Sequence, residues 1–120
     1  MAILEEQQLH NLAMNIAGKD LESMGYEFLG VNSKIGKNPQ FVAIKDSKLI
    51  FVLVRAIQYP DNPVFYDKAL AEKVRDHGEK HKARTYYAGV GLANSLDYDL
   101  PIDSDQNYIV NYTGLIEIKP

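Results

Sequence analysis

His77 and His81 stand four residues apart in a segment with helical periodicity. This spacing places two imidazoles on one side of a helix, where they could share a divalent metal ion. The His-Glu-x-x-His pattern of zinc proteases is absent, because Glu79 stands one position too late. Both histidines also continue the apolar stripe of the helix, so we expect them to cap its interface with a sheet. They remain weak metal candidates, and no metal or other cofactor is expected.

The pattern Gly89-Val90-Gly91 follows a predicted strand, as the glycine-rich loop of dinucleotide-binding proteins does. Asn94 occupies the third glycine position of that fingerprint, and no segment with clear helical periodicity follows. We therefore interpret these glycines as the geometry of a strand end rather than as a nucleotide site.

Four aspartates lie in the segment 91–107 at partly alternating positions, an arrangement in which carboxylates can bind calcium. The segment contains a proline and lacks the glycine and the terminal glutamate of an EF-hand loop. An irregular acidic surface loop, with or without a helical turn, is expected. The four residues are Asp97, Asp99, Asp103 and Asp105.

Basic side chains gather in residues 68–84, where six lysines and arginines accompany three acidic residues. Such an excess can bind phosphate groups, although a solvated helix face is the commoner role. Lys73 and Lys80 are the contacts expected from this helix if nucleic acid binds. Lys34 and Lys37 are two further candidates, in a turn-rich segment over residues 32–40.

The 120-residue chain is 46% hydrophobic and 24% charged, which is typical of one soluble globular domain over residues 1–120. The absence of cysteine excludes thiolate nucleophiles, cysteine-bound zinc, thioredoxin chemistry and cysteine-bound iron–sulfur clusters. A net charge of −3 argues against a general polyanion binder. Because the sequence shows neither an apolar run of membrane-spanning length nor a signal peptide, we expect a cytoplasmic protein without a membrane partner.

The elements that must position these residues follow from hydrophobic periodicity. A helix is predicted over residues 9–24, ending at Gly25, and a short strand over residues 26–31. The apolar runs 41–44 and 49–54, around a four-residue polar turn, predict a β-hairpin. Because the second run does not alternate with polar residues, its strand is expected to be central and covered on both faces.

The second half of the chain predicts another amphipathic helix, beginning at about Asn62 or Phe65 and ending at about Lys82. Strands are predicted over residues 85–90 and 108–118, with Gly114 as a possible bulge. The fold class is therefore α/β, with a mixed sheet flanked by both helices.

Several residues of the first half have a distinctive spacing: Leu21-Glu22-x-x-Gly25-Tyr26-x-x-Leu29-x-x-Asn32-x-Lys34, then the hairpin, then Phe51-Val52-x-Val54-Arg55. With this pattern the chain resembles, over about residues 12–90, small bacterial proteins related to Holliday-junction resolvases. Those proteins belong to the restriction-endonuclease-like superfamily. The resemblance implies a restriction-endonuclease-like fold with the order αβββαβ, here followed by a C-terminal strand.

The resemblance also implies where a nuclease site would lie. In that superfamily a strand aspartate and an acid-x-Lys pair bind magnesium and orient the attacking water. Position by position, the strand aspartate falls on Val42, the second acid on Leu53 and the lysine on Arg55. An additional acid falls on Gln40, and an acid of the first helix falls near Asn15. All the metal-binding carboxylates are missing, so no catalytic residue is assigned.

The chain is also similar to small proteins that carry the name of the flavin- and NADH-binding component of the sodium-translocating NADH:quinone reductase. The residues do not support that name, because the component needs cysteine ligands for an iron–sulfur cluster and this chain has none.

We therefore expect a non-catalytic binding or scaffold domain. The alternative is a salt-sensitive nucleic-acid binder that uses Arg55, the lysines of residues 32–40 and the basic helix over residues 68–84. An enzymatic alternative would combine His77 and His81 with tyrosines or aspartates of residues 85–105. Nucleic acid, another protein or a second copy of the chain are the partners considered, the last through tyrosines or an apolar final strand.

Overall fold

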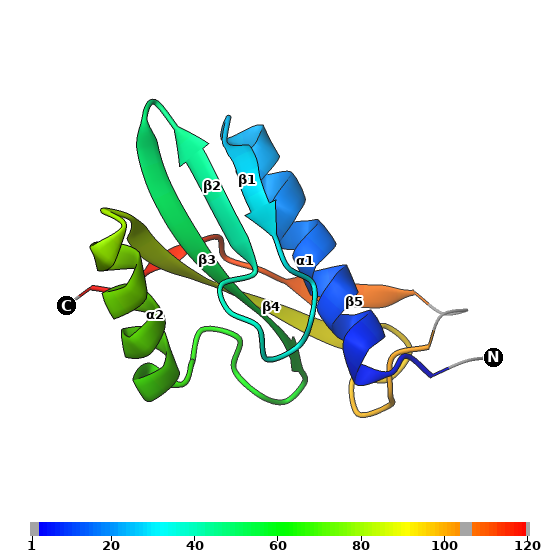
Figure 1. The fold of residues 1–120 in the computed structure, drawn as a ribbon. Coiled ribbons are helices and arrows are strands. Elements are labelled where there is room, and N and C mark those ends of the chain that lie inside the picture. The colour runs from blue at the N-terminus through cyan, green and yellow to red at the C-terminus, as the bar shows by residue number, and fades with distance from the viewer. Residues whose placement is uncertain (1–2, 104–106, 120) are drawn as a thin grey trace.

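A mixed sheet of six strands and two helices form the protein in the computed structural model, which describes residues 3–103 and 107–119 (Figure 1). In chain order the elements are α1 (Glu6–Ser23), β1 (Glu27–Val31), β2 (Phe41–Lys45), β3 (Lys48–Gln58), α2 (Lys68–Lys80), β4 (Arg84–Asn94), β5 (Tyr108–Asn111) and β6 (Ile116–Glu117). The predicted α/β class and the order αβββαβ are confirmed, whereas the predicted C-terminal strand is divided into two. Within the described residues, no helix is both long enough and apolar enough to cross a membrane.

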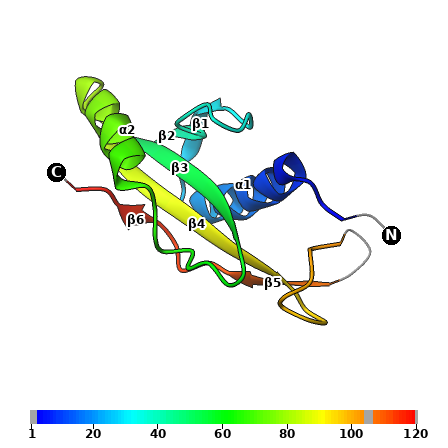
Figure 2. The same cartoon turned by 90° about the horizontal axis from the view of Figure 1, so that it is seen from below.

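The sheet has the order β1-β2-β3-β4-β5, with β6 also paired to β4. Strands β1, β2 and β3 run antiparallel in succession, whereas β3 and β4 are parallel and are joined by α2. Figure 2 shows α1 on one side of β3 and β4, and the connection to α2 on the other. Strand β3 is central and its residues face both layers, as predicted: Val52 and Val54 join the core beneath α1, while Phe51 and Leu53 join the core beneath α2.

The sequence explains both where helix α1 begins and where it ends. Glu5 and Gln8 form a reciprocal capping box at the start. The buried face repeats at helical spacing through Ala13, Ala17 and Leu21. Gly25 follows the helix with φ +92°, a left-handed conformation that suits glycine.

The β2–β3 hairpin has a tighter turn than the four residues predicted. Asp46 and Ser47 are its only turn residues, with φ of 51° and 64°, so pairing continues as far as Lys45 and Lys48. Two successive residues with positive φ match the right-handed twist of the paired strands, which explains the short connection.

Helix α2 begins later than predicted. Its first residue is Lys68, and the Asp67 side chain caps it by accepting a hydrogen bond from the Leu70 N–H at 3.2 Å. Tyr66 mimics the helical spacing of apolar residues but belongs to the preceding connection, where its ring lies 4.9 Å from that of Tyr87. The prediction therefore extended a helical pattern into a segment of turns.

The interpretation of Gly89 and Gly91 as a strand end is wrong, because β4 continues to Asn94 and both residues are internal. A Cβ atom on Gly89 would lie 1.9 Å from the Pro63 carbonyl oxygen, and one on Gly91 would lie 3.0 Å from the Asn111 carbonyl oxygen. These glycines therefore allow neighbouring backbone to pass close to β4.

The predicted strand over residues 108–118 is divided into β5 and β6, which pair with the same edge of β4. Five positions separate Asn111 from Ile116, whereas only four separate their partners Gly91 and Tyr87. The chain leaves the strand over residues 112–115, and Gly114 lies in this connection at φ +95°, a left-handed conformation that suits glycine. The side chains of β5 are exposed at this edge of the sheet.

The acidic segment before β5 is an irregular loop with a turn, in which the Leu100 N–H donates to the Asp97 carbonyl at 3.0 Å. Asp97 and Asp99 are exposed, but Asp103 is buried, so the prediction of a purely surface loop is wrong at this residue. Asp103 is also paired in a single bridge with Ile3. Asp105 lies outside the described residues.

Candidate functional site

Arg55 lies where β3 extends beyond its neighbour β2. Pairing with β2 ends at Phe41 and Val52. From there onward the segment 32–40 lies against the edge of β3 instead of a strand, and the Gln40 N–H donates to the Val52 carbonyl at 3.0 Å. The result is a local opening in the sheet edge, bordered by a loop, in which side chains can satisfy backbone groups.

The side chain of Gln40 joins this loop to β3. It is fully buried, and its Oε1 accepts hydrogen bonds from the Val54 N–H at 2.8 Å and from Arg55 Nη1 at 3.3 Å. Its Nε2 donates to the Lys37 carbonyl at 3.0 Å and to Asn38 Oδ1 at 2.8 Å. A carboxylate could not donate these last two bonds, which explains why an amide suits the position where the resemblance implies an acid.

Among the described residues, the guanidinium of Arg55 is held by neutral acceptors alone. Nη1 donates to the Val54 carbonyl at 2.8 Å and to Gln40 Oε1, and Nη2 donates to Asn38 Oδ1 at 3.0 Å. Among the described residues, no carboxylate oxygen lies within 4 Å of it. Burial lowers the pKa of Arg55, with opposing effects from Tyr87 and Asp67. Arg55 is thus a partly buried cation without a close counter-charge.

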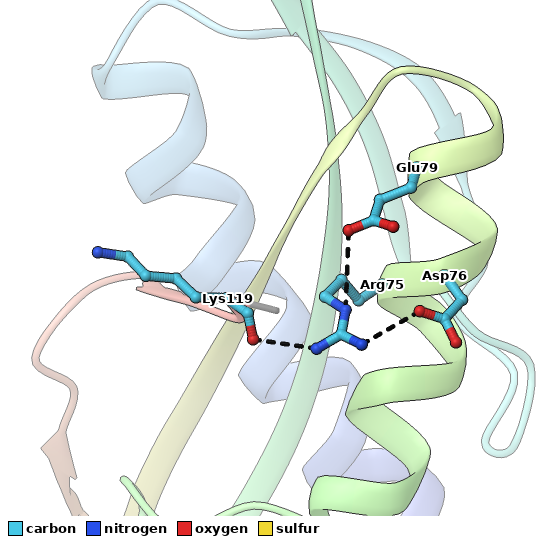
Figure 3. A network of polar contacts seen from close by, with 4 residues as sticks. All are labelled: Arg75, Asp76, Glu79 and Lys119. Carbon is cyan, nitrogen blue, oxygen red and sulfur yellow. Dashed lines mark hydrogen bonds and ion pairs between the residues drawn. The ribbon is translucent and has the colours of Figure 1, made fainter.

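Arg75 on α2 provides a contrast (Figure 3). Its guanidinium lies 3.2 Å from Asp76 Oδ1 and 3.8 Å from Glu79 Oε1, and it donates to the Lys119 carbonyl at 3.0 Å. The charge of Arg75 is therefore compensated locally and ties α2 to the C-terminal segment. No comparable carboxylate surrounds Arg55 in the part of the chain that the structure describes.

The positions implied by the nuclease resemblance are only partly brought together. Val42 and Leu53 lie on the α2 side of neighbouring strands, on the same face as Arg55. Both are hydrocarbon side chains and offer no oxygen to a magnesium ion. Asn15 is exposed on α1, on the opposite side of the sheet, where it lines a groove with Phe41.

The predicted nucleic-acid contacts form two separate groups. Lys34 and Lys37 are exposed in a turn, closed by a hydrogen bond from the Lys37 N–H to the Lys34 carbonyl at 3.2 Å, and Gln40 connects this turn to Arg55. Lys73 and Lys80 are exposed on α2. Lys80 lies ten residues beyond Leu70, which borders a pocket with Arg55, and ten helical residues span roughly 15 Å. The structure therefore connects the backbone of the lysine turn to Arg55 through Gln40, whereas Lys80 lies at the far end of α2.

His77 and His81 pack together at the end of α2. Their ring centroids are 4.9 Å apart, and they lie 5.6 and 6.0 Å from that of Phe51, respectively. They thus cap the edge of the helix–sheet interface while remaining exposed. Within the described residues, no third histidine, aspartate or glutamate joins them in a metal-binding group.

His10 is a site residue that the sequence analysis missed. It lies on the buried face of α1, only 5% exposed, and its Nε2 atom has no hydrogen-bond partner among the described residues. Burial and the charge of Arg55 lower its pKa, whereas Glu6 opposes the shift. The available signal was a polar residue at an apolar position of the α1 stripe, next to Leu9 and before Ala13.

Arg55 borders two cavities on opposite sides of the sheet. One, of about 250 Å³, lies against α1 and includes His10, Ile35 and Ala56. The other, of about 220 Å³, lies against the start of α2 and includes Asp67 and Tyr87. The arrangement can bind an anionic group through Arg55, because such a group would supply the missing counter-charge.

The chain matches a protein-family model over most of its length. The model of a family described as Domain of unknown function (DUF8840) matches residues 7–118. Neither a curated protein nor a solved structure matches the chain.

Proposed function

We propose that this chain, which belongs to the DUF8840 family, is a non-catalytic binding module built on a restriction-endonuclease-like fold. The order of a helix, three antiparallel strands, a crossover helix and a parallel strand supports the fold. Hydrocarbon side chains at Val42 and Leu53, where the resemblance implies carboxylates, support the loss of metal-dependent cleavage. A cytoplasmic location is part of the proposal and rests on composition.

One observation carries the proposal of binding. Arg55 is oriented by three neutral acceptors, on Val54, Gln40 and Asn38, and lacks a carboxylate within 4 Å in the described part of the chain. A partly buried cation is stabilised when an anion approaches it, because the anion replaces lost hydration. The module therefore recognises an anionic group at Arg55.

Nucleic acid is the second candidate ligand. It is favoured by the turn that carries Lys34 and Lys37, because Gln40 holds this turn beside Arg55. Three cations on adjacent segments can contact successive phosphates of one strand. The net charge of −3 confines such binding to this local surface.

A cleavage assay tests the non-catalytic character. Four-way-junction, duplex and single-stranded DNA would be incubated with the purified protein and Mg²⁺ or Mn²⁺. We expect intact DNA. Metal-dependent cleavage that disappears in Arg55→Ala would overturn the proposal, because it would assign catalytic chemistry to this site.

Fluorescence anisotropy of the same DNA molecules tests the second candidate. Titrations at about 50 and about 200 mM salt should show weaker binding at the higher concentration if phosphates are the contacts. Arg55→Gln should weaken binding, whereas Lys48→Gln, at the exposed first residue of β3, serves as the matched control. If no DNA form binds, the anionic ligand is not DNA.

A further inference from the structure

The cavity between α1 and the end of β3 has a mixed lining. Its walls are apolar at Leu9, Ile35 and Ala56, and Gly36 leaves one side without a side chain. The polar lining residues are Glu6, His10, Arg55 and Gln58. Three separate segments, α1, the loop 32–40 and β3, thus enclose about 250 Å³, which suits a small molecule or the end of a chain.

His10 is the feature that identifies this cavity as a binding site. His10 is one of the residues that line the cavity, it is only 5% exposed, and Nε2 has no hydrogen-bond partner among the described residues. A buried polar atom without a partner destabilises the folded protein, so a ligand that bonds to it gains that energy. Among the described residues, the second cavity beside Arg55 has no such unpaired buried atom in its lining.

The charges of the cavity define the ligand. Arg55 has five N–H donors, of which the contacts with Val54, Gln40 and Asn38 use three. Two N–H groups remain for a ligand, which is the number that a carboxylate accepts from an arginine. Arg55 is the one lysine or arginine among the lining residues, and Glu6 disfavours an anion of higher charge, so a ligand with a single carboxylate is favoured.

We propose that this cavity binds the carboxylate of a small aliphatic acid, with Arg55 on the carboxylate, His10 Nε2 on one of its oxygens, and Leu9, Ile35 and Ala56 around the aliphatic body. The same chemistry is offered by a free acid and by the C-terminal carboxylate of a peptide that ends in an aliphatic residue. The inference rests on the proposed binding module and names its ligand class.

A nuclear magnetic resonance titration of the isotope-labelled full chain tests the inference. The probes are 3-methylbutanoate for the free acid and N-acetylvaline for the chain end, with 3-methylbutanamide as the uncharged control. The readouts are the Gly36 amide and the His10 imidazole. We expect saturable shifts with both acids and at least tenfold weaker binding of the amide. Tighter binding of 3-methylbutanoate would identify the ligand as a free acid, and tighter binding of N-acetylvaline would identify it as a peptide C-terminus.

Variants separate the site from general charge effects. Arg55→Gln should weaken binding of the two acids at least tenfold. Arg55→Lys should weaken their binding less, because lysine keeps the charge but not the paired donors. Ala56→Leu should also abolish binding by filling the cavity, while both polar residues remain. Lys48→Gln should leave the affinity unchanged. Ala56→Leu keeps the test decisive if changes at Arg55 prevent folding.

Three results would overturn the inference: equal affinity for acid and amide, unchanged binding in Ala56→Leu, or inorganic phosphate binding more tightly than either acid. In each case the binding module itself would stand if another anion still required Arg55. Metal-dependent DNA cleavage, in contrast, would overturn the proposed function without changing the carboxylate titration.

Discussion

At the scale of single residues, the amide of Gln40 has the largest structural role around Arg55. It satisfies the Val54 N–H, which has no strand partner on that side, and it also fixes the loop through the Lys37 carbonyl and Asn38. Arg55 therefore depends on a neighbour for its orientation. The position that the resemblance assigns to an acid has become a structural connection between a loop and the central strand.

Gln40→Ala should lower the free energy of unfolding by about 2–4 kcal/mol, because it removes four hydrogen bonds and leaves buried backbone groups unpaired. Urea unfolding monitored by circular dichroism measures the change. Gln58→Ala, at the exposed end of β3, is the control and should change stability by less than about 0.5 kcal/mol. Equal effects of the two changes would contradict this role of Gln40.

His10 should make stability depend on pH. Its folded-state pKa is lowered, first by burial and then by Arg55, from an ordinary value of 6.5. As pH falls below 6.5, the unfolded chain takes up a proton before the folded chain does. The contribution of neutral His10 to the free energy of unfolding is therefore complete above pH 6.5 and is lost as pH falls through the folded-state pKa. Urea unfolding at about pH 7.5 and about pH 5 should show a smaller loss of stability in His10→Gln than in the wild type; an equal or larger loss would exclude His10 as the cause.

At the scale of elements, the sequence predicted the helices and strands wherever local pattern and tertiary packing agree. The unbroken apolar run 49–54 correctly indicated a central strand, because β3 is covered on both faces. Gly25 correctly marked the end of α1. Local chemistry therefore determined the main elements of this fold.

The predictions failed where a distant segment determines the local structure. Gly89 and Gly91 are internal to β4 because the backbone at Pro63 and Asn111 passes close to them, and no local pattern contains that information. The start of α2 was misplaced because Tyr66 packs on Tyr87 from a loop. At the site, Arg55 and the lysine turn were predicted, but their connection through Gln40 and the cavity at His10 require the three-dimensional structure.

Ser47→Gly should stabilise the β2–β3 hairpin. Ser47 has φ of 64°. This left-handed conformation is strained for a residue with a side chain but not for glycine. The expected gain is about 0.5–1 kcal/mol in the free energy of unfolding, measured by urea denaturation. Ser33→Gly is the matched control, because Ser33 is an exposed loop residue without a positive φ. A gain in the control alone would contradict the explanation.

At the scale of the whole molecule, the distribution of charge determines how nucleic acid could bind. The net charge is −3, but Lys34 and Lys37 lie in a turn whose backbone is connected to Arg55 through Gln40, whereas Lys73 and Lys80 lie on α2. The structure therefore places the basic residues that the sequence analysis considered together as nucleic-acid contacts on two different elements, the lysine turn and α2.

The salt dependence of binding should reveal which basic surface contacts a single strand. Three phosphate contacts predict a slope of about −2 in the logarithm of affinity against the logarithm of salt concentration, or a roughly twentyfold loss between about 50 and about 200 mM. Lys34→Gln with Lys37→Gln should reduce the slope to about one third. Lys73→Gln with Lys80→Gln is the matched control and should leave it unchanged, as measured by anisotropy. The reverse result would place the contacts on α2.

The parallel pairing of β3 with β4 has a consequence for the order of folding. The β2–β3 hairpin closes over two residues, whereas Ile50 and Arg84 meet only after all of α2 has been bridged. Local contacts close faster than distant ones, because less chain entropy is lost. Helix α1 packs on both β3 and β4, so the first element in the chain obtains its full packing surface only after β4 has joined. We therefore expect folding to begin at the central hairpin and to dock the N-terminal helix late.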